Sequence, residues 1–144
     1  GLPVNVKRGQ FLDPRAMTHV KGKLPDAQVW ACERGTTFGH GDLVFDPRAL
    51  VWMRAAGMPV VFDCTHSNQR PGAGPSTDGD REMAFPLARA AAAVGIDALF
   101  AEVHLDPPNA KSDSATQLTI AQFTRLAAEV QAIDATRCAL EASR

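Results

Sequence analysis

The sequence carries almost no net charge and has no long hydrophobic run. Its 144 residues contain 15 lysines and arginines against 16 aspartates and glutamates, a formal net charge of −1. There is no polybasic stretch and no acidic tail, so the charge pattern gives no case for binding nucleic acid or a membrane surface. No run of about 18 apolar residues occurs, which argues against a membrane-spanning helix. The first residues show no signal-peptide pattern, so we expect no export.

Cysteine is also scarce, with only Cys32, Cys64 and Cys138. An odd number of widely spaced cysteines without an export signal predicts reduced thiols in a cytoplasmic protein. Cys32 and Cys64 fall in or beside apolar segments, where packing is the simplest interpretation. Hydrophobic residues make up 45% of the chain, which is typical of one soluble globular unit.

Short apolar segments alternate with helical segments four times along the chain. The expected strands are residues 4–7, 28–32, 59–63 and 98–102, and the expected helices are residues 13–23, 48–56, 81–94 and 120 to near the C-terminus. Asp13-Pro14 and Asp46-Pro47 are typical helix starts, with an N-cap residue followed by proline at the first helical position. Such alternation predicts an α/β fold with parallel strands joined by right-handed crossovers.

Two α/β folds fit this pattern, a doubly wound sheet and part of a (β/α)8 TIM barrel. No glycine-rich phosphate-binding pattern follows the first strand, which weakens the nucleotide-binding version of the doubly wound fold. A complete barrel needs about 250 residues, so four βα units amount to half of one. Half a barrel has two open edges. We therefore expect residues 1–144 to be a fragment or truncated form, or a unit that closes its sheet with a partner.

The candidate metal ligands are His66, Glu102, His104 and Asp113. His66 follows the third expected strand, Glu102 ends the fourth, and Asp113 lies in the next loop. The C-terminal ends of parallel strands are where α/β barrels build their active sites. Imidazole and carboxylate ligands suit a divalent first-row cation such as Mn, Fe, Zn or Co. Their spacing matches no established metal motif, so from spacing alone ordinary polar loop residues are the favoured interpretation.

The candidate anion-binding residues are Lys7, Arg8, Arg34 and Arg70. Each lies at or just after the end of an expected strand, so we expect them to converge at one edge of the sheet. Clustered cations there suit a phosphate or carboxylate ligand. Solvated surface charge is the alternative. Arg34 fits that alternative least, because it lies between an apolar strand and a turn that begins at Gly35.

Four segments, taken in order, resemble 3-deoxy-D-manno-octulosonate 8-phosphate synthase. They are residues 4–11, 33–39, 62–69 and 112–118. The resemblance extends over nearly the whole chain, with matching spacing. It implies the C-terminal half of that enzyme's (β/α)8 barrel, with this chain supplying strands five to eight.

The resemblance also implies an activity, a site and an assembly. The family condenses phosphoenolpyruvate with D-arabinose 5-phosphate, releases phosphate, and makes a sugar acid phosphate for lipopolysaccharide. By resemblance, Lys7 and Arg34 bind phosphoenolpyruvate and Gln69 lies near the sugar, while Arg70 is a further candidate for substrate binding. The metal-dependent class implies a divalent metal held by His66, Glu102 and Asp113, with His66 and Asp113 as the catalytic candidates. Family members are usually tetramers, so the resemblance implies a homo-oligomer.

Several features depart from the family pattern. The fourth metal ligand, a cysteine on the first barrel strand, has no counterpart in this chain, and neither do the phosphate-binding segments of the first half. Residues 77–81 lack the usual double glycine, and Ala115 stands where many members have serine. We expect this chain alone to be poorly active or inactive. The alternatives are the related 3-deoxy-heptulosonate 7-phosphate synthase, whose motifs match less well, and a non-catalytic half-barrel that binds phosphorylated ligands or a partner chain.

Overall fold

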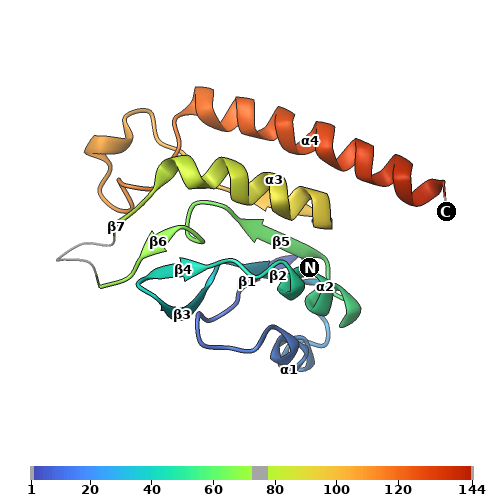
Figure 1. Ribbon diagram of the computed structural model, residues 1–144. Helices are drawn as coiled ribbons and strands as arrows, with labels where there is room; N and C mark the ends of the chain where they lie inside the picture. The colour runs from blue at the N-terminus through green and yellow to red at the C-terminus, as the bar shows by residue number, and fades with distance from the viewer. Residues whose placement is uncertain (1, 73–77, 144) are drawn as a thin grey trace.

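A parallel sheet of four strands lies at the centre of the computed structural model, which describes residues 2–72 and 78–143 (Figure 1). Residues 73–77, inside the expected loop between residues 70 and 80, lie outside the described residues. The strand order is β1-β2-β5-β8, and every neighbouring pair is parallel. The strands are β1 (Val4–Lys7), β2 (Val29–Glu33), β5 (Val60–Asp63) and β8 (Ala98–Phe100). The predicted α/β class is confirmed.

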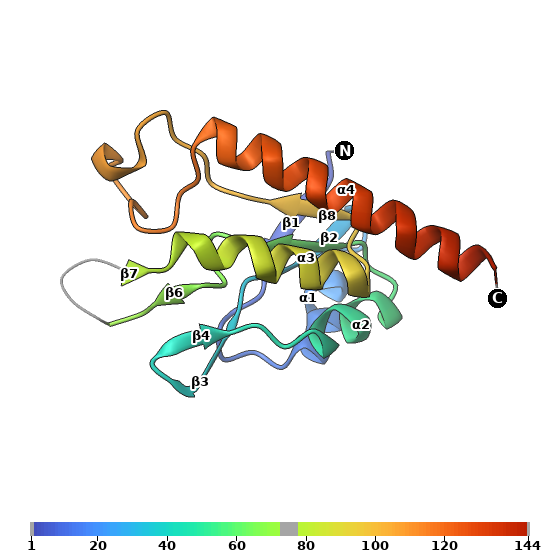
Figure 2. The same ribbon diagram turned by 45° about the horizontal axis from the view of Figure 1, so that its top comes forward.

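A helix follows each of these strands in the chain, as the alternating pattern predicted. They are α1 (Met17–Lys23), α2 (Arg48–Ala55), α3 (Ala84–Val94) and α4 (Ile120–Ala142), with short 3-10 turns at Pro14–Ala16, Arg81–Met83 and Pro107–Asn109. The carboxylates of Asp13 and Asp46 accept hydrogen bonds from backbone amides two residues later, which satisfies donors at both expected helix starts. Thr119 and Gln122 form a capping box at the start of α4. Figure 2 shows α3 and α4 running beside each other over the sheet.

The two faces of the sheet differ in what they contact. Ala31, Val60 and Phe62 belong to the main core, which they share with Leu50 and other apolar helix residues. Successive strand residues point to opposite faces. The other face therefore carries the register partners Lys7, Cys32 and Val61, together with Asp63, the residue two positions after Val61. Lys7 and Asp63 thus share the face opposite the helices, at the C-terminal ends of their strands.

Two antiparallel hairpins were not expected from the sequence. One pairs β3 (Thr36–His40) with β4 (Asp42–Val44), and the other pairs β6 (Gln69–Arg70) with β7 (Asp78–Gly79). The fourth strand is also shorter than predicted, because it ends at Phe100 and only a single bridge from Val103 to Leu118 continues it. Within the described ranges, no helix combines the length and apolar character that crossing a membrane requires.

Asp97, just before β8, should make the folded protein less stable at acid pH. Its Oδ2 atom accepts hydrogen bonds from the Val60 amide (2.7 Å) and from the Arg54 guanidinium (3.1 Å). Burial alone would raise the pKa of Asp97, but these bonds outweigh it and hold the pKa below its ordinary value of 3.8. A carboxyl whose pKa is lowered by folding stabilises the protein above pH 4 or so, and that contribution disappears as the pH falls through the lowered pKa.

We expect Asp97→Asn to lower the free energy of unfolding at pH 7 by about 1 kcal/mol, a modest figure because the side chain is half exposed. The difference from wild type should shrink as the pH falls below about 4. Urea unfolding followed by circular dichroism at several pH values measures it. A difference that stays constant down to the lowest pH would contradict the assignment.

Candidate functional site

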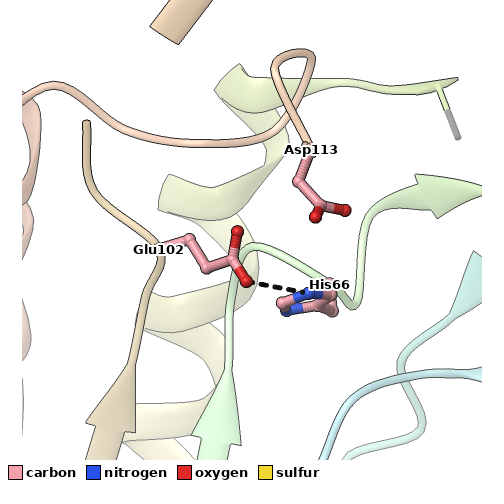
Figure 3. Close-up of side chains that lie close together, drawn as sticks. All are labelled: His66, Glu102 and Asp113. Atoms are coloured by element: carbon pink, nitrogen blue, oxygen red, sulfur yellow. Dashed lines mark ion pairs between the residues drawn. The ribbon is translucent and has the colours of Figure 1, made fainter. Parts of the chain in front are cut away.

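Three of the four candidate metal ligands converge at the C-terminal end of the sheet. His66, Glu102 and Asp113 each offer one ligand atom, and these atoms all lie within 4.8 Å of one another (Figure 3). His66 Nε2 is 3.3 Å from Glu102 Oε1. The residues come from the loops after β5 and β8 and from the loop before α4. His104 is not in this group, and its Nδ1 atom accepts a hydrogen bond from the Asp106 amide.

The loop that carries Asp113 has an unusual backbone. Asp113 has φ 51°, in the left-handed region that non-glycine residues adopt rarely. Its carbonyl accepts hydrogen bonds from the amides of Thr116 and Gln117, both at 3.0 Å. The Arg81 guanidinium, from the turn before α3, donates to the carbonyls of Ser114 and Gln117. These bonds hold the loop in a strained shape that brings the Asp113 carboxylate to the other two side chains, and such strain is common at functional sites.

The two carboxylates of the cluster each accept a hydrogen bond from a glutamine side chain. The side-chain amide of Gln117 donates to Glu102 Oε2 (3.1 Å), so the other Glu102 oxygen faces His66. The Gln69 amide donates to Asp113 Oδ1 (2.6 Å). Partners of this kind fix the orientation of metal ligands in known sites. The cluster is therefore an oriented arrangement rather than a chance meeting of flexible surface groups.

Asp63 is the partner of His66 and was missed by the sequence analysis. Its carboxylate is fully buried, and Oδ2 lies 2.8 Å from both His66 Nδ1 and Lys7 Nζ. Oδ1 accepts hydrogen bonds from the backbone amides of Thr65 and His66. Burial alone would raise the pKa of Asp63, but the bonds and charges of His66 and Lys7 lower it below its usual range. His66 Nδ1 therefore faces Asp63 and Lys7, and Nε2 faces Glu102.

Lys7 and Arg34 reach the edge of this cluster. The Lys7 side chain is about one-third exposed, and its Nζ atom lies 3.3 Å from His66 Nδ1 and 4.1 Å from the centroid of the Phe100 ring. Arg34 donates to the side-chain oxygen of Gln69 at 3.2 Å. Two cations beside three converging ligands can bind a phosphate or carboxylate group next to a metal ion.

Arg8 and Arg70, the other two candidate cations, are held by carboxylates. Arg8 is buried and forms a two-pronged pair with Glu33, with both nitrogen–oxygen distances at 2.7 Å. It also donates to Thr36 Oγ1 and to three backbone carbonyls, those of Gly9, Leu12 and Gly35. Since Arg8 follows Lys7 and Glu33 precedes Arg34, the pair fixes the backbone next to both of the cations that lie beside the cluster. Arg70 instead pairs with Asp42 of the other hairpin (2.9 Å) and with Asp78 of its own hairpin (3.7 Å).

The chemistry of the converging donors fits a divalent cation. One imidazole nitrogen and two carboxylates suit Mn, Fe, Zn or Co, and three protein ligands are typical of catalytic rather than structural zinc-type sites. The cysteines do not add to this set. Burial, with a contribution from the Asp63 charge, raises the pKa of the Cys32 and Cys64 thiols to about 12. Cys64 donates its thiol hydrogen to the Phe100 carbonyl.

Comparison with known proteins bears on the resemblance drawn from the four sequence segments. Residues 1–137 match the model of the DAHP synthetase I family. Curated relatives named 2-dehydro-3-deoxyphosphooctonate aldolase include one from Xylella fastidiosa, 49% identical over 148 aligned positions that cover 98% of this chain and 54% of the relative. Another, from Fusobacterium nucleatum, is 44% identical over 140 positions, covering 92% of this chain and 50% of the relative.

A relative from Caulobacter vibrioides with the same name is 48% identical over 139 positions, which cover 94% of this chain and 48% of the relative. The chain therefore spans about half the length of the curated relatives it matches. These matches confirm the resemblance that the motifs indicated. From the match over residues 1–137, the chain belongs to the DAHP synthetase I family.

Proposed function

We propose that residues 1–144 form the C-terminal half of a (β/α)8 barrel synthase. The enzyme condenses phosphoenolpyruvate with D-arabinose 5-phosphate to give 3-deoxy-D-manno-octulosonate 8-phosphate and phosphate, a step of lipopolysaccharide biosynthesis. The name carried by the curated relatives denotes this synthase. One observation carries the proposal: Lys7 and Arg34 lie beside the converging His66, Glu102 and Asp113 in a chain of this family.

The unpaired edges of the sheet support the barrel. Among the described strands, β1 and β8 each have a neighbour on one side only. Further strands along both edges would close the sheet, and the relatives are about twice as long as this chain. We also propose a cytoplasmic homo-oligomer, with the tetramer that the family resemblance implies.

The reaction brings together two anionic substrates, and the cations of the chain would offset their repulsion. Carbon 3 of phosphoenolpyruvate attacks the aldehyde carbon of the sugar and forms the new carbon–carbon bond, while water adds at carbon 2 and phosphate leaves. Lys7 and Arg34 would bind the phosphate and carboxylate of phosphoenolpyruvate. Holding both substrates in place also supplies proximity. Gln69, beside Arg34, would lie near the sugar. Arg70 would contact substrate only by leaving its two carboxylate partners.

His66, Glu102 and Asp113 would hold a divalent cation, Mn, Fe, Zn or Co. Such an ion, when bound, polarises an aldehyde oxygen or lowers the pKa of a water molecule. His66 would present Nε2 because Asp63 holds the opposite ring nitrogen. Asp113 would present a carboxylate that Gln69 and the Arg81-bound loop keep in place. These two residues are the proposed catalytic ligands.

Phosphate release from phosphoenolpyruvate tests the function. The assay compares arabinose 5-phosphate with erythrose 4-phosphate, with added manganese or with a chelator. It uses the chain alone and the chain co-expressed with the N-terminal half of the Xylella relative. We expect release in the assembled protein that needs arabinose 5-phosphate and is lost on chelation. Release with erythrose 4-phosphate instead would favour the heptulosonate synthase, and no release in the assembled protein would favour a non-catalytic half-barrel.

A further inference from the structure

Two buried side chains each connect a proposed substrate cation to a proposed metal ligand. Asp63 Oδ2 lies 2.8 Å from Lys7 Nζ and 2.8 Å from His66 Nδ1. The second connection is made by Gln69, a buried residue whose side-chain oxygen and nitrogen each form a hydrogen bond. Its oxygen accepts from Arg34 at 3.2 Å, and its nitrogen donates to the carboxylate of the third ligand in the cluster at 2.6 Å.

We propose that Asp63 and Gln69 are positioning residues that couple anion binding to metal binding, so that occupancy of either site tightens the other. The inference rests on the proposed function and deepens it, because it states how the two halves of that site communicate. Coupling between two sites is reciprocal: the factor by which one ligand tightens the other is the same in both directions.

The Asp63 connection works through shared charge. In the free chain, one buried carboxylate oxygen lies 2.8 Å from both the Lys7 ammonium nitrogen and His66 Nδ1. An anion that engages Lys7 offsets the ammonium charge, and more of the Asp63 charge then acts on His66. A carboxylate at Nδ1–H increases the basicity of Nε2 and makes it a better metal ligand. Because Asp63 is fully buried, little solvent screens this effect.

The Gln69 connection works through fixed orientation. A guanidinium can only donate hydrogen bonds and a carboxylate can only accept them, so the carboxamide fits between Arg34 and Asp113 in one orientation. A metal ion bound to Asp113 would hold that carboxylate still, and Gln69 would in turn hold Arg34. An anion arriving at Arg34 then meets a side chain that is already ordered, and binding is tighter because less freedom is lost.

Direct attraction between the anion and the metal ion would also couple the two sites. That attraction acts through space and does not need either connecting side chain. Substitution of Gln69 or Asp63 therefore measures the part of the coupling that the protein itself transmits.

The test is manganese binding to the 144-residue chain, followed by calorimetry and by electron paramagnetic resonance, with and without saturating phosphoenolpyruvate. In wild type we expect phosphoenolpyruvate to tighten manganese about fivefold or more. Gln69→Met, which keeps the length of the side chain and removes both hydrogen bonds, should reduce this factor, and so should Asp63→Asn, while the part that direct attraction supplies remains in both variants. The control is Gln131→Met, the same change at an exposed residue of α4, which should keep the wild-type factor.

Three results would overturn the inference: a wild-type factor of one, no manganese binding, or an unchanged factor in Gln69→Met. Circular dichroism checks that each variant folds, and Gln69→Met decides the matter if Asp63→Asn does not fold. The phosphate-release assay separates this inference from the proposed function. Sugar-dependent phosphate release in the assembled protein, with coupling that Gln69→Met leaves unchanged, would remove the inference alone.

Discussion

Replacing His66 or Asp113 by alanine is expected to lower manganese affinity by more than about 100-fold. Loss of a residue that only orients a metal ligand costs up to about 100-fold, and loss of a ligand itself should cost more. Only three side chains of the described residues converge there, so removing one leaves two ligand atoms. The same variants, assembled with an N-terminal half, should lose metal-dependent phosphate release. Calorimetric titration with manganese and metal content after dialysis measure the binding loss.

His104→Ala is the matched control for His66→Ala. His104 lies two residues after Glu102, but its Nδ1 atom accepts from the Asp106 amide and it is outside the converging group. Manganese affinity should therefore be unchanged in this variant. His66→Ala and Asp113→Ala proteins with wild-type metal content would remove the assignment of the metal site.

The main sheet and its helices could be predicted because their signals are local. Each strand is a short apolar run, and aspartate–proline pairs begin the turn that leads into α1 and precede α2, with carboxylates that accept backbone amides. The two hairpins could not be predicted in the same way. Their segments are rich in glycine, threonine and aspartate, which read as loops. The hairpins are linked by the pair between Arg70 and Asp42, residues 28 positions apart.

The candidate site shows the same division between local and long-range information. His66, Glu102 and Asp113 could be selected because each follows a strand end, and the family resemblance supported them. Asp63 could have been found as the carboxylate that ends the third strand, three residues before His66. The role of Arg81 could not, because it depends on a loop 33 residues away in the chain.

Four cations at strand ends look alike in the sequence but differ in the structure. Lys7 and Arg34 contact side chains in or beside the cluster, through Asp63, His66 and Gln69, whereas Arg8 and Arg70 pair with carboxylates outside it. The carboxylate that holds Arg8 is Glu33, on the neighbouring strand. Only the register of β1 against β2 brings these two residues together, and register is not visible in one strand alone.

Arg8→Met is expected to lower the free energy of unfolding by about 3–5 kcal/mol, the range for breaking a buried ion pair from one side. The substitution leaves the Glu33 carboxylate buried with only the Gly35 amide as a partner among the bonds described. It also removes the donor that serves Thr36 Oγ1 and the Gly9 and Leu12 carbonyls. Urea unfolding measures the loss. Arg48→Met, which breaks an ion pair at the exposed start of α2, should have a far smaller effect.

The double variant Arg8→Met/Glu33→Leu separates two parts of the lost stability, the part due to the unpaired Glu33 carboxylate and the part due to the lost Arg8 hydrogen bonds. Replacing a buried ion pair by apolar residues of similar volume is often neutral or stabilising, so the double variant should be more stable than Arg8→Met alone. It should not reach wild type, because Thr36 and the loop carbonyls still lack their donor. The remaining deficit is the contribution of the Arg8 hydrogen bonds to the loop after Lys7 and to the segment just after Arg34. Full recovery of stability in the double variant would show that the pair does not hold these loops.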